Sequence, residues 1–181
     1  MYVSRRRSTQ PTRERIMASV REQLEEGAFH GSTVEEVAAR AGVSRATLYQ
    51  HFGSRLGLVD ALCETFSETP ALVAIRTVAD VEGLVRLSCE FWAAEEKILA
   101  QLYGVAAVDP AARDLVDRQR RDRYAELRRV LAAAGAADAF AELAVLTSFE
   151  TFEELRRSVG LSQEDVVRTL QAAAARLTQT P

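Results

Sequence analysis

The chain has 181 residues, of which 48% are hydrophobic and 27% charged, and its formal net charge is -3. This balance is typical of a folded globular protein and excludes disorder over most of the chain. The two cysteines are too few for a disulfide framework and lack metal-ligand spacing, so we expect no metal and a reducing compartment. There is no apolar run long enough for a membrane span or a signal peptide. The sequence therefore predicts a soluble, cytoplasmic protein.

Charge is unevenly distributed along the chain. Residues 1–62 hold nine arginines and seven acidic residues, whereas residues 63–181 hold 14 basic and 19 acidic residues. A mildly basic front on an acidic body fits a nucleic-acid-binding head. A difference of this size does not by itself identify the class of partner.

The first 55 residues predict three short helices. Apolar side chains recur every four positions over residues 12–26, which gives one helix with a single apolar stripe. A second helix begins at Thr33, because Thr33 and Glu36 have the spacing of a capping box. Ser44 can cap a third helix that runs through Phe52.

Beyond these helices the predicted elements lengthen. Glycines and prolines fall mostly at the joints between apolar-periodic segments, and no strand-length run alternates apolar and polar residues. We expect further helical segments from residue 54 to about residue 70 and over residues 80–95, 96–107, 110–134, 136–159 and 162–177, while residues 72–77 are ambiguous. The sequence therefore predicts an all-α fold of about nine helices.

Residues 33–52 have the pattern of a helix-turn-helix. Gly42 lies in a tight turn, where glycine adopts a positive φ without steric cost. Val37 and Leu48 are placed to lock the two helices at a steep angle. This arrangement leaves one face of the second helix free to enter a major groove of DNA.

That free face has the side chains for reading bases. Leu48 and Phe52 face inward. The opposite face then holds Ala46 and Gln50, and Arg45 leaves the helix in its first turn. Alanine permits close approach to the bases, arginine suits guanine and glutamine suits adenine. Side chains suited to phosphate contacts, which fix the register on DNA, surround this face: Thr33, Ser44, Thr47, Tyr49, His51 and Arg55.

Residues 33–55 resemble the DNA-binding head of the tetracycline-repressor (TetR) family. The resemblance rests on Ala-Gly-Val-Ser, Thr-Leu-Tyr and His-Phe in one register, and it covers about residues 10–65. It implies a homodimer whose three N-terminal helices bind DNA and whose C-terminal helices bind a small molecule. By position it assigns DNA contacts to Thr33, Ser44, Arg45, Thr47, Tyr49, His51 and Arg55.

The chain departs from this family pattern at two places. Ala46 stands where members often have glycine, and Leu56-Gly57 follows Arg55 where members often have an acidic residue. Glycine in the first turns of a helix costs up to ~1 kcal/mol relative to alanine. The sequence therefore does not determine how stiffly the helix after Arg55 couples the DNA-binding head to the C-terminal helices.

From this we predict a one-component transcriptional regulator: a repressor that binds a palindromic operator as a homodimer and is released by an effector. The predicted domains are a flexible basic arm (1–11), the helix-turn-helix domain (12–55), a helical regulatory and dimerisation domain (56–177) and a tail (178–181). No enzyme or cofactor is expected, because the chain lacks a metal-ligand cluster, a phosphate loop and a nucleophile motif. The alternative is a DNA-binding dimer whose body recognises a protein or no ligand.

The C-terminal helices set large aromatic residues opposite small ones, which predicts a mainly apolar cavity. The arginine-rich run 118–123 is interpreted as a solvated face, and no buried cation is evident, so a flat apolar or aromatic effector is favoured. The alternative is that the same side chains only pack. The residues predicted to line the cavity are Phe66, Cys89, Trp92, Leu99, Tyr103, Tyr124, Phe149 and Phe152.

The last two predicted helices, 136–159 and 162–177, are candidates for the dimer interface, as the family resemblance implies. An alanine run in the second of them permits close helix approach. The alternative is that these helices pack only within one chain. The predicted interface residues are Phe140, Leu143, Val166, Leu170 and Ala174.

Overall fold

The structure, a computed structural model, describes residues 4–29 and 32–178, and the predicted all-α fold is confirmed. These residues form ten α-helices, a single 3-10 turn (η1) and no strand. None of these helices has the length and apolar character needed to cross a bilayer. The elements are α1 (Ser4–Glu25), α2 (Val34–Arg40), α3 (Arg45–Phe52), α4 (Arg55–Phe66), α5 (Pro70–Ile75), α6 (Val81–Ala106), α7 (Pro110–Ala133), η1 (Ala137–Ala139), α8 (Phe140–Leu146), α9 (Phe149–Arg157) and α10 (Gln163–Thr178).

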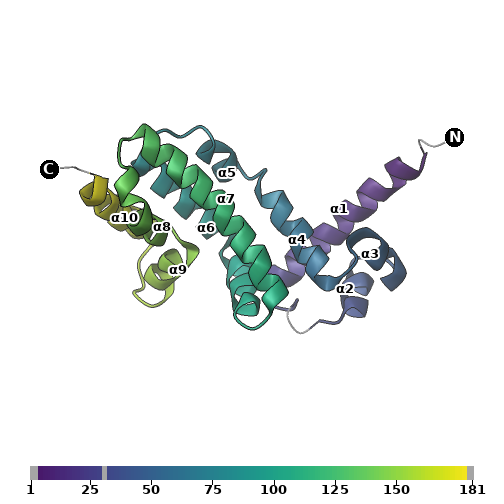
Figure 1. Ribbon diagram of the computed structural model, residues 1–181. Coiled ribbons are helices and arrows are strands. Elements are labelled where there is room, and N and C mark those ends of the chain that lie inside the picture. Colours follow the sequence, from purple (N-terminus) through teal and green to yellow (C-terminus); the bar gives the residue numbers. More distant parts are fainter. Residues whose placement is uncertain (1–3, 30–31, 179–181) are drawn as a thin grey trace.

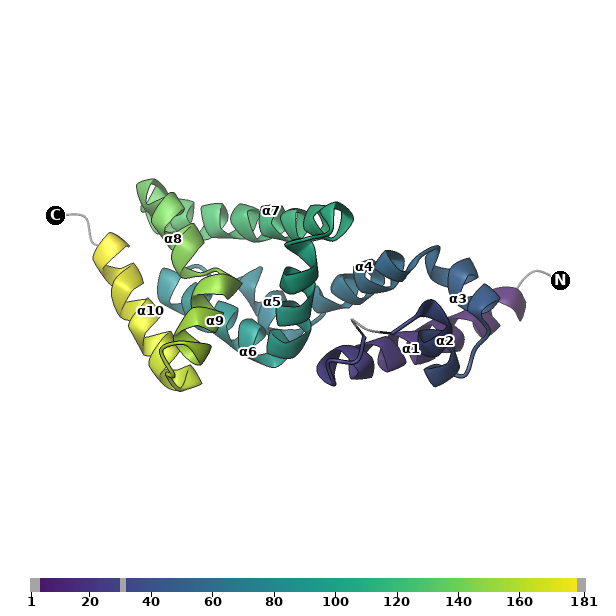
Figure 2. The ribbon, with the colours of Figure 1, turned by 90° about the horizontal axis from the view of Figure 1, so that it is seen from below.

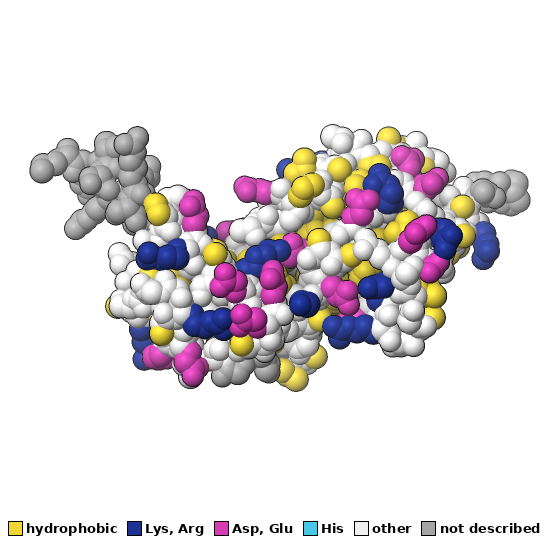
Figure 3. All heavy atoms as spheres, turned by 180° about the vertical axis from the view of Figure 1, so that it is seen from behind, with side chains coloured by type: hydrophobic (Ala, Val, Ile, Leu, Met, Phe, Trp, Pro, Cys, Tyr) yellow, Lys and Arg dark blue, Asp and Glu magenta, His cyan; other side chains and the backbone are white. Residues whose placement is uncertain are grey.

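The molecule is elongated, with a small head at one end and a larger helical body at the other. Figure 1 and Figure 2 show α1 to α3 in the head, α5 to α10 in the body, and α4 running between them. Charged side chains of both signs are interspersed over the face shown in Figure 3. One hydrophobic core runs through head and body, because the apolar stripes of α1, α4 and α6 meet where the two parts join.

The caps predicted for the head helices are present. The Thr33 hydroxyl accepts a hydrogen bond from the backbone N–H of Glu36, and the Glu36 carboxylate accepts one from the backbone N–H of Thr33. Ser44 caps α3 by accepting from the N–H of Thr47, 3.1 Å away. These bonds satisfy donors that a helix start leaves without partners. Both helix starts are therefore encoded locally.

The first helix is longer than the sequence predicted. It begins at Ser4 rather than Thr12, and Pro11 lies inside it. The basic arm predicted at 1–11 lies partly outside the described residues, as does the tail predicted at 178–181. The flexibility of the arm stays a prediction.

Two other boundaries differ in the body. Residues 80–107, expected as two segments, form the single helix α6. The expected helix 136–159 is broken into η1, α8 and α9. The break follows from local polar chemistry, because the hydroxyl of Thr147 donates to the carbonyl of Leu143 and Ser148 caps α9.

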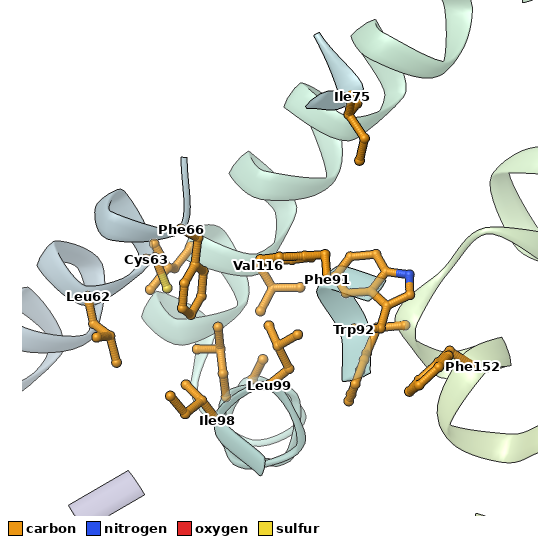
Figure 4. Close-up of a cluster of buried hydrophobic side chains, with 14 of the residues drawn as sticks. Leu62, Cys63, Phe66, Ile75, Phe91, Trp92, Ile98, Leu99, Val116 and Phe152 are labelled. Atoms are coloured by element: carbon orange, nitrogen blue, oxygen red, sulfur yellow. The ribbon is translucent and has the colours of Figure 1, made fainter. Parts of the chain in front are cut away.

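Helix α6 lies at the centre of the body and is packed against α5, α7 and α10. The aromatic residues of α6 contact rings on neighbouring helices. The ring centroids of Phe91 and Phe66 are 5.6 Å apart, and those of Trp92 and Phe149 are 5.8 Å apart. Figure 4 shows this cluster between α4, α6 and α9. Ring contacts of this kind add to the free energy gained by burial. The predicted helical core of the body is thus built around α6.

Head and body are joined by polar contacts as well as apolar ones. The Arg21 guanidinium on α1 donates to both carboxylate oxygens of Glu95 on α6 at 2.5 Å. Glu95 is only 4% exposed, so its charge depends on this partner. Nearby, the Gln101 side-chain amide donates to the carbonyl of Leu24. Both bonds tie α1 directly to α6.

Gly57 has a structural reason to be glycine. A Cβ at this position would meet the carbonyl oxygen of Phe52, where the first turn of α4 passes close to the end of α3. The helix-propensity cost of glycine is therefore offset by close packing of α4 against the helix-turn-helix.

Candidate functional site

The helix-turn-helix is held by backbone bonds and by its core. Gly42 has a φ of 64°, the left-handed conformation predicted for the turn. The N–H of Val43 donates to the carbonyl of Ala38 at 3.0 Å and closes the turn. Val37 and Leu48 are fully buried where α2 crosses α3. The relative orientation of the two helices is therefore set before any partner binds.

The outward face of α3 carries the residues predicted to read bases. Arg45, Ala46 and Gln50 are exposed, while Leu48 is buried on the opposite face. Of the residues predicted to contact phosphates, Thr33, Ser44 and Tyr49 are exposed, and Thr47 and His51 are half-buried.

Arg45 already has partners in the free protein. Its guanidinium pairs with the Glu35 carboxylate on α2 and lies 5.3 Å from the centre of the Tyr49 ring. The hydrogen bond to Tyr49, followed by the charge of Glu35, raises the pKa of Arg45. Because Arg45 is 60% exposed, this surface pair holds the side chain only weakly. The guanidinium is thus held near the α3 surface and is free to exchange its partner.

Arg55 differs from the other predicted DNA contacts. Its guanidinium donates to the carbonyl of Phe29 and lies 4.6 Å from the centre of the Phe29 ring. Burial lowers the pKa of Arg55. The side chain lines a cavity of about 330 Å³ between head and body, together with Leu24 and Ile98. Helical periodicity could not predict this position of Arg55, because it depends on where Phe29 returns in the fold.

The body contains a second, larger cavity of about 430 Å³. It lies between α4, α5, α6 and α7 and reaches the break between α8 and α9. Of the residues predicted to line it, Phe66, Trp92 and Tyr103 do so. The indole N–H of Trp92 donates to the carbonyl of Thr147 at 3.1 Å, which fixes the ring against the break.

The other predicted lining residues lie elsewhere. Cys89, Leu99, Phe149 and Phe152 are each at most 1% exposed and pack in the core without lining the cavity. Tyr124 packs its ring against Phe140 at 5.7 Å. The helical period of the apolar residues predicted correctly which face of each helix is buried. It did not predict which of the buried side chains line the cavity.

The expectation of a cavity without cations is wrong. Arg76, Arg120 and Arg123 line it, and the last two come from the run interpreted as a solvated face. Helix α7 presents these two arginines inward, because positions three apart share a face, while Arg121 is exposed. The sequence contains the i, i+3 spacing, but the direction of α7 toward the cavity is a tertiary feature.

Burial shifts the titration of several body groups. It raises the pKa of Tyr103 to about 12, with the neighbouring Glu150 carboxylate adding to the shift. Burial likewise raises the pKa of the Cys63 and Cys89 thiols to about 12. These groups are neutral at neutral pH. The described residues contain no group of three or more His, Cys, Asp or Glu side chains placed to hold a metal ion.

Most of the residues predicted at the dimer interface are buried inside this single chain. Leu143, Val166, Leu170 and Ala174 are at most 3% exposed, and Phe140 is half-buried beneath the Arg128 guanidinium. The outward sides of α8 and α10 carry other apolar side chains, including Val145 and Leu177.

Comparison with known proteins supports the interpretation of the head. Residues 16–62 match the family model described as bacterial regulatory proteins, tetR family. The HTH-type transcriptional regulator UidR of Escherichia coli K12 is 38% identical over 53 residues, which are 29% of this chain and 27% of UidR. The matched segment thus spans well under two thirds of that relative.

The fold of the whole chain is shared with solved structures. GusR of Salmonella enterica superposes with a TM-score of 0.76 at 22% identity, covering 94% of this chain and 96% of GusR. A Rhodococcus sp. protein described as a TetR-family transcriptional regulator superposes with a TM-score of 0.72 at 19% identity, covering 93% and 98%. A helix-turn-helix with an exposed second helix, a family model that matches residues 16–62 and a shared architecture lead to one conclusion: the head of this chain is a DNA-binding domain of the TetR-family type, joined to a helical body that shares the fold of these solved structures.

Proposed function

We propose that the protein is a repressor that binds a palindromic operator as a homodimer and is released by a small-molecule effector. The observation that carries the proposal is the exposed face of α3, held rigidly over a fully buried helix-turn-helix core. In this proposal residues 12–55 form the DNA-binding domain and residues 56–177 the regulatory and dimerisation domain.

On the operator, Arg45, Ala46 and Gln50 contact base edges in the major groove. Arg45 exchanges its Glu35 partner for guanine. The hydroxyls and rings around α3 contact phosphates and fix the register, as proposed for Thr33, Ser44, Thr47, Tyr49 and His51. Arg55 is proposed to contribute through its contact with Phe29, which ties the start of α4 to the loop that follows α1.

A dimer would place two α3 helices in successive major grooves, about 34 Å apart. We propose that its interface is formed by the outward sides of α8 and α10, since their inner sides are occupied within the chain. Exposed alanines at 172 and 175 permit close approach of α10 to its copy, and Val145 is 65% exposed on α8. The two helices from each chain would form an isologous four-helix contact.

Substitution of Val145 by glutamate tests this interface. Sedimentation of the wild type is expected to show a particle of twice the chain mass, and Val145→Glu is expected to shift it toward the monomer. Val108→Glu serves as the control, because Val108 is 81% exposed in the loop between α6 and α7. A monomeric wild type at micromolar concentration would contradict both the dimer and the palindrome.

The effector is proposed to bind in the 430 Å³ cavity. A ligand that favours a body conformation unable to place both heads on DNA would release the operator, and such couplings are typically ~1–3 kcal/mol. Helix α4 and the Arg21–Glu95 pair are the physical connections between the cavity-bearing body and the head.

Selection of binding sites from a random pool of duplex DNA tests the proposed function. We expect an enriched palindrome whose half-site centres lie about one helical turn apart, with affinity that falls steeply as salt rises. Enrichment of single half-sites, or of no sequence, would contradict the proposal.

A further inference from the structure

The effector cavity is lined by an arginine, Arg123, that forms no ion pair with a carboxylate of the described residues. We propose that the cavity binds an amphipathic organic anion, with a carboxylate paired to Arg123 and an apolar portion against the aromatic wall. This inference rests on the proposed effector-binding role of the body and specifies the chemical class of the ligand.

The first argument is how Arg123 is held. Its Nη1 donates to the carbonyl of Ala144 at 3.1 Å and to the hydroxyl of Thr147 at 3.0 Å. Both acceptors are neutral, and no carboxylate of the described residues forms an ion pair with this arginine. The side chain is half-buried, and burial lowers the pKa of Arg123 by more than the charge of Glu150, which is itself paired with Arg120, raises it. An incoming anion would supply the missing charge.

The second argument comes from the other charges at the cavity. Arg120 is neutralised by Asp117 and Glu150, and Glu126 is paired with Arg129. Asp122 also lines the cavity but is exposed, so solvent screens its charge. Arg76, whose guanidinium donates to the carbonyl of Ser67, adds a further positive charge at the exposed edge. Among the described groups that line the cavity, Arg123 is therefore the half-buried charge without an ion pair.

The third argument is the shape and lining of the space. A volume of about 430 Å³ exceeds what a simple inorganic anion needs, and Phe66, Phe91 and Trp92 form an apolar wall. Figure 4 shows these three rings gathered between α4 and α6. A planar guanidinium binds a carboxylate through two parallel hydrogen bonds, which gives orientation as well as affinity. One polar end and one apolar body are thus the features that a ligand needs.

The experiment compares three probes of similar size: phenylbutyrate, phenylbutanol and phenylbutylamine. Binding to the full chain is followed by the emission of Trp92, the only tryptophan, and by calorimetry. We expect phenylbutyrate to bind about ten- to hundred-fold more tightly than phenylbutanol, because a charged hydrogen-bonded pair replaces a neutral contact. Phenylbutylamine is expected to bind most weakly. Equal or tighter binding of the alcohol or the amine overturns the proposal, as does no binding of phenylbutyrate at millimolar concentration.

Two substitutions localise the effect. Arg123→Gln keeps a donor for Ala144 and is expected to abolish the preference for phenylbutyrate over phenylbutanol while the alcohol still binds. Arg121→Gln, on the exposed side of the same helix, is the matched control and is expected to preserve the preference. A preference that survives in a folded Arg123→Gln variant overturns the assignment. If that variant does not fold, the comparison of the three probes on the wild type still tests whether the cavity prefers an anion.

The anion proposal and the proposed function fail in different ways. Operator release by all three probes would support effector control while contradicting the preference for an anion. Selective binding of phenylbutyrate with unchanged operator affinity would support the anion site and contradict its proposed role in release.

Discussion

The outward face of α3 and the inward face of α7 both present arginines, but the two regions use them differently. Arg45 is 60% exposed and holds a weak partner, Glu35, that it can exchange. Arg123 is half-buried between neutral acceptors and forms no ion pair with a carboxylate of the described residues. An exposed charge is stabilised by water whether or not it is paired, whereas a buried one is not. The first region is thus suited to a large, hydrated partner and the second to a small one that enters the protein.

The two regions also differ in how they are built. The helix-turn-helix depends on caps and a turn encoded within about 20 residues, from the Thr33 cap to the end of α3. The cavity is assembled from α4 to α7 and the break at Thr147. A substitution in the body core should therefore act through the stability of the whole chain, and one on the outward face of α3 through DNA affinity alone.

The largest effect is expected for Phe152→Ala. Phe152 is fully buried in the body core, and removing such a ring costs ~3–5 kcal/mol of unfolding free energy. Urea unfolding measures the loss. The comparison is Val159→Ala, at a position 58% exposed, which should change the unfolding free energy by less than about 0.5 kcal/mol. A small loss for Phe152→Ala would mean that the body core tolerates a void.

The next largest effect is expected where head and body meet. Arg21→Met leaves the Glu95 carboxylate buried without its partner, which should cost ~2 kcal/mol of unfolding free energy. The matched control is Arg40→Met, which removes the surface pair with Glu26 and should cost well under 1 kcal/mol. Equal losses for the two variants would show that the Arg21–Glu95 pair behaves like a surface contact.

On α3, Arg45→Ala should weaken binding about ten- to hundred-fold for the preferred operator and relax base preference at one position. Thermal stability should stay unchanged, since Arg45 is exposed. Tyr49→Phe should instead weaken all operator variants alike. Gel-shift titration of each protein variant against a panel of operators that differ by one base pair distinguishes loss of base preference from a uniform loss of affinity. Unchanged discrimination by Arg45→Ala would remove this residue from base readout.

The smallest effect on stability at neutral pH concerns the buried thiols, which are mostly neutral there in the folded and in the unfolded chain. Because burial raises the pKa of Cys63 and Cys89 from 9.0 to about 12, the neutral thiols stabilise the fold fully below pH 9. This contribution is lost as pH rises from 9 toward 12. At pH 8 alkylation by iodoacetamide should be about a thousand-fold slower in the folded chain than in urea. Rapid labelling of Cys89 in the native protein would contradict its burial.

Labelling also distinguishes the two regions of the body. Cys63 lines the cavity, whereas Cys89 is 1% exposed in the core. A cavity ligand should therefore slow the labelling of Cys63 further and leave that of Cys89 unchanged. Equal protection of both would indicate a general stabilisation instead of occupancy of the cavity.

The sequence by itself determined the head. The capping box at Thr33, the positive φ at Gly42 and the cap at Ser44 are short-range features, and all three are present in the structure. The exposed positions of Arg45, Ala46 and Gln50 follow from the period of one helix. Local chemistry is sufficient here, because each of these features depends on residues at most five positions apart.

Tertiary structure decided the rest. Periodicity places Phe149, Phe152 and Leu170 on inner faces, but only packing shows that they fill a core and do not line a cavity or an interface. The same holds for Arg55, which meets Phe29, and for Arg123, whose charge the sequence placed in solvent. The physical reason is that the helical period fixes which side of a helix is apolar, while the neighbour on that side comes from distant parts of the chain. Whether that neighbour is a ring, a carbonyl or empty space is set only when the helices pack.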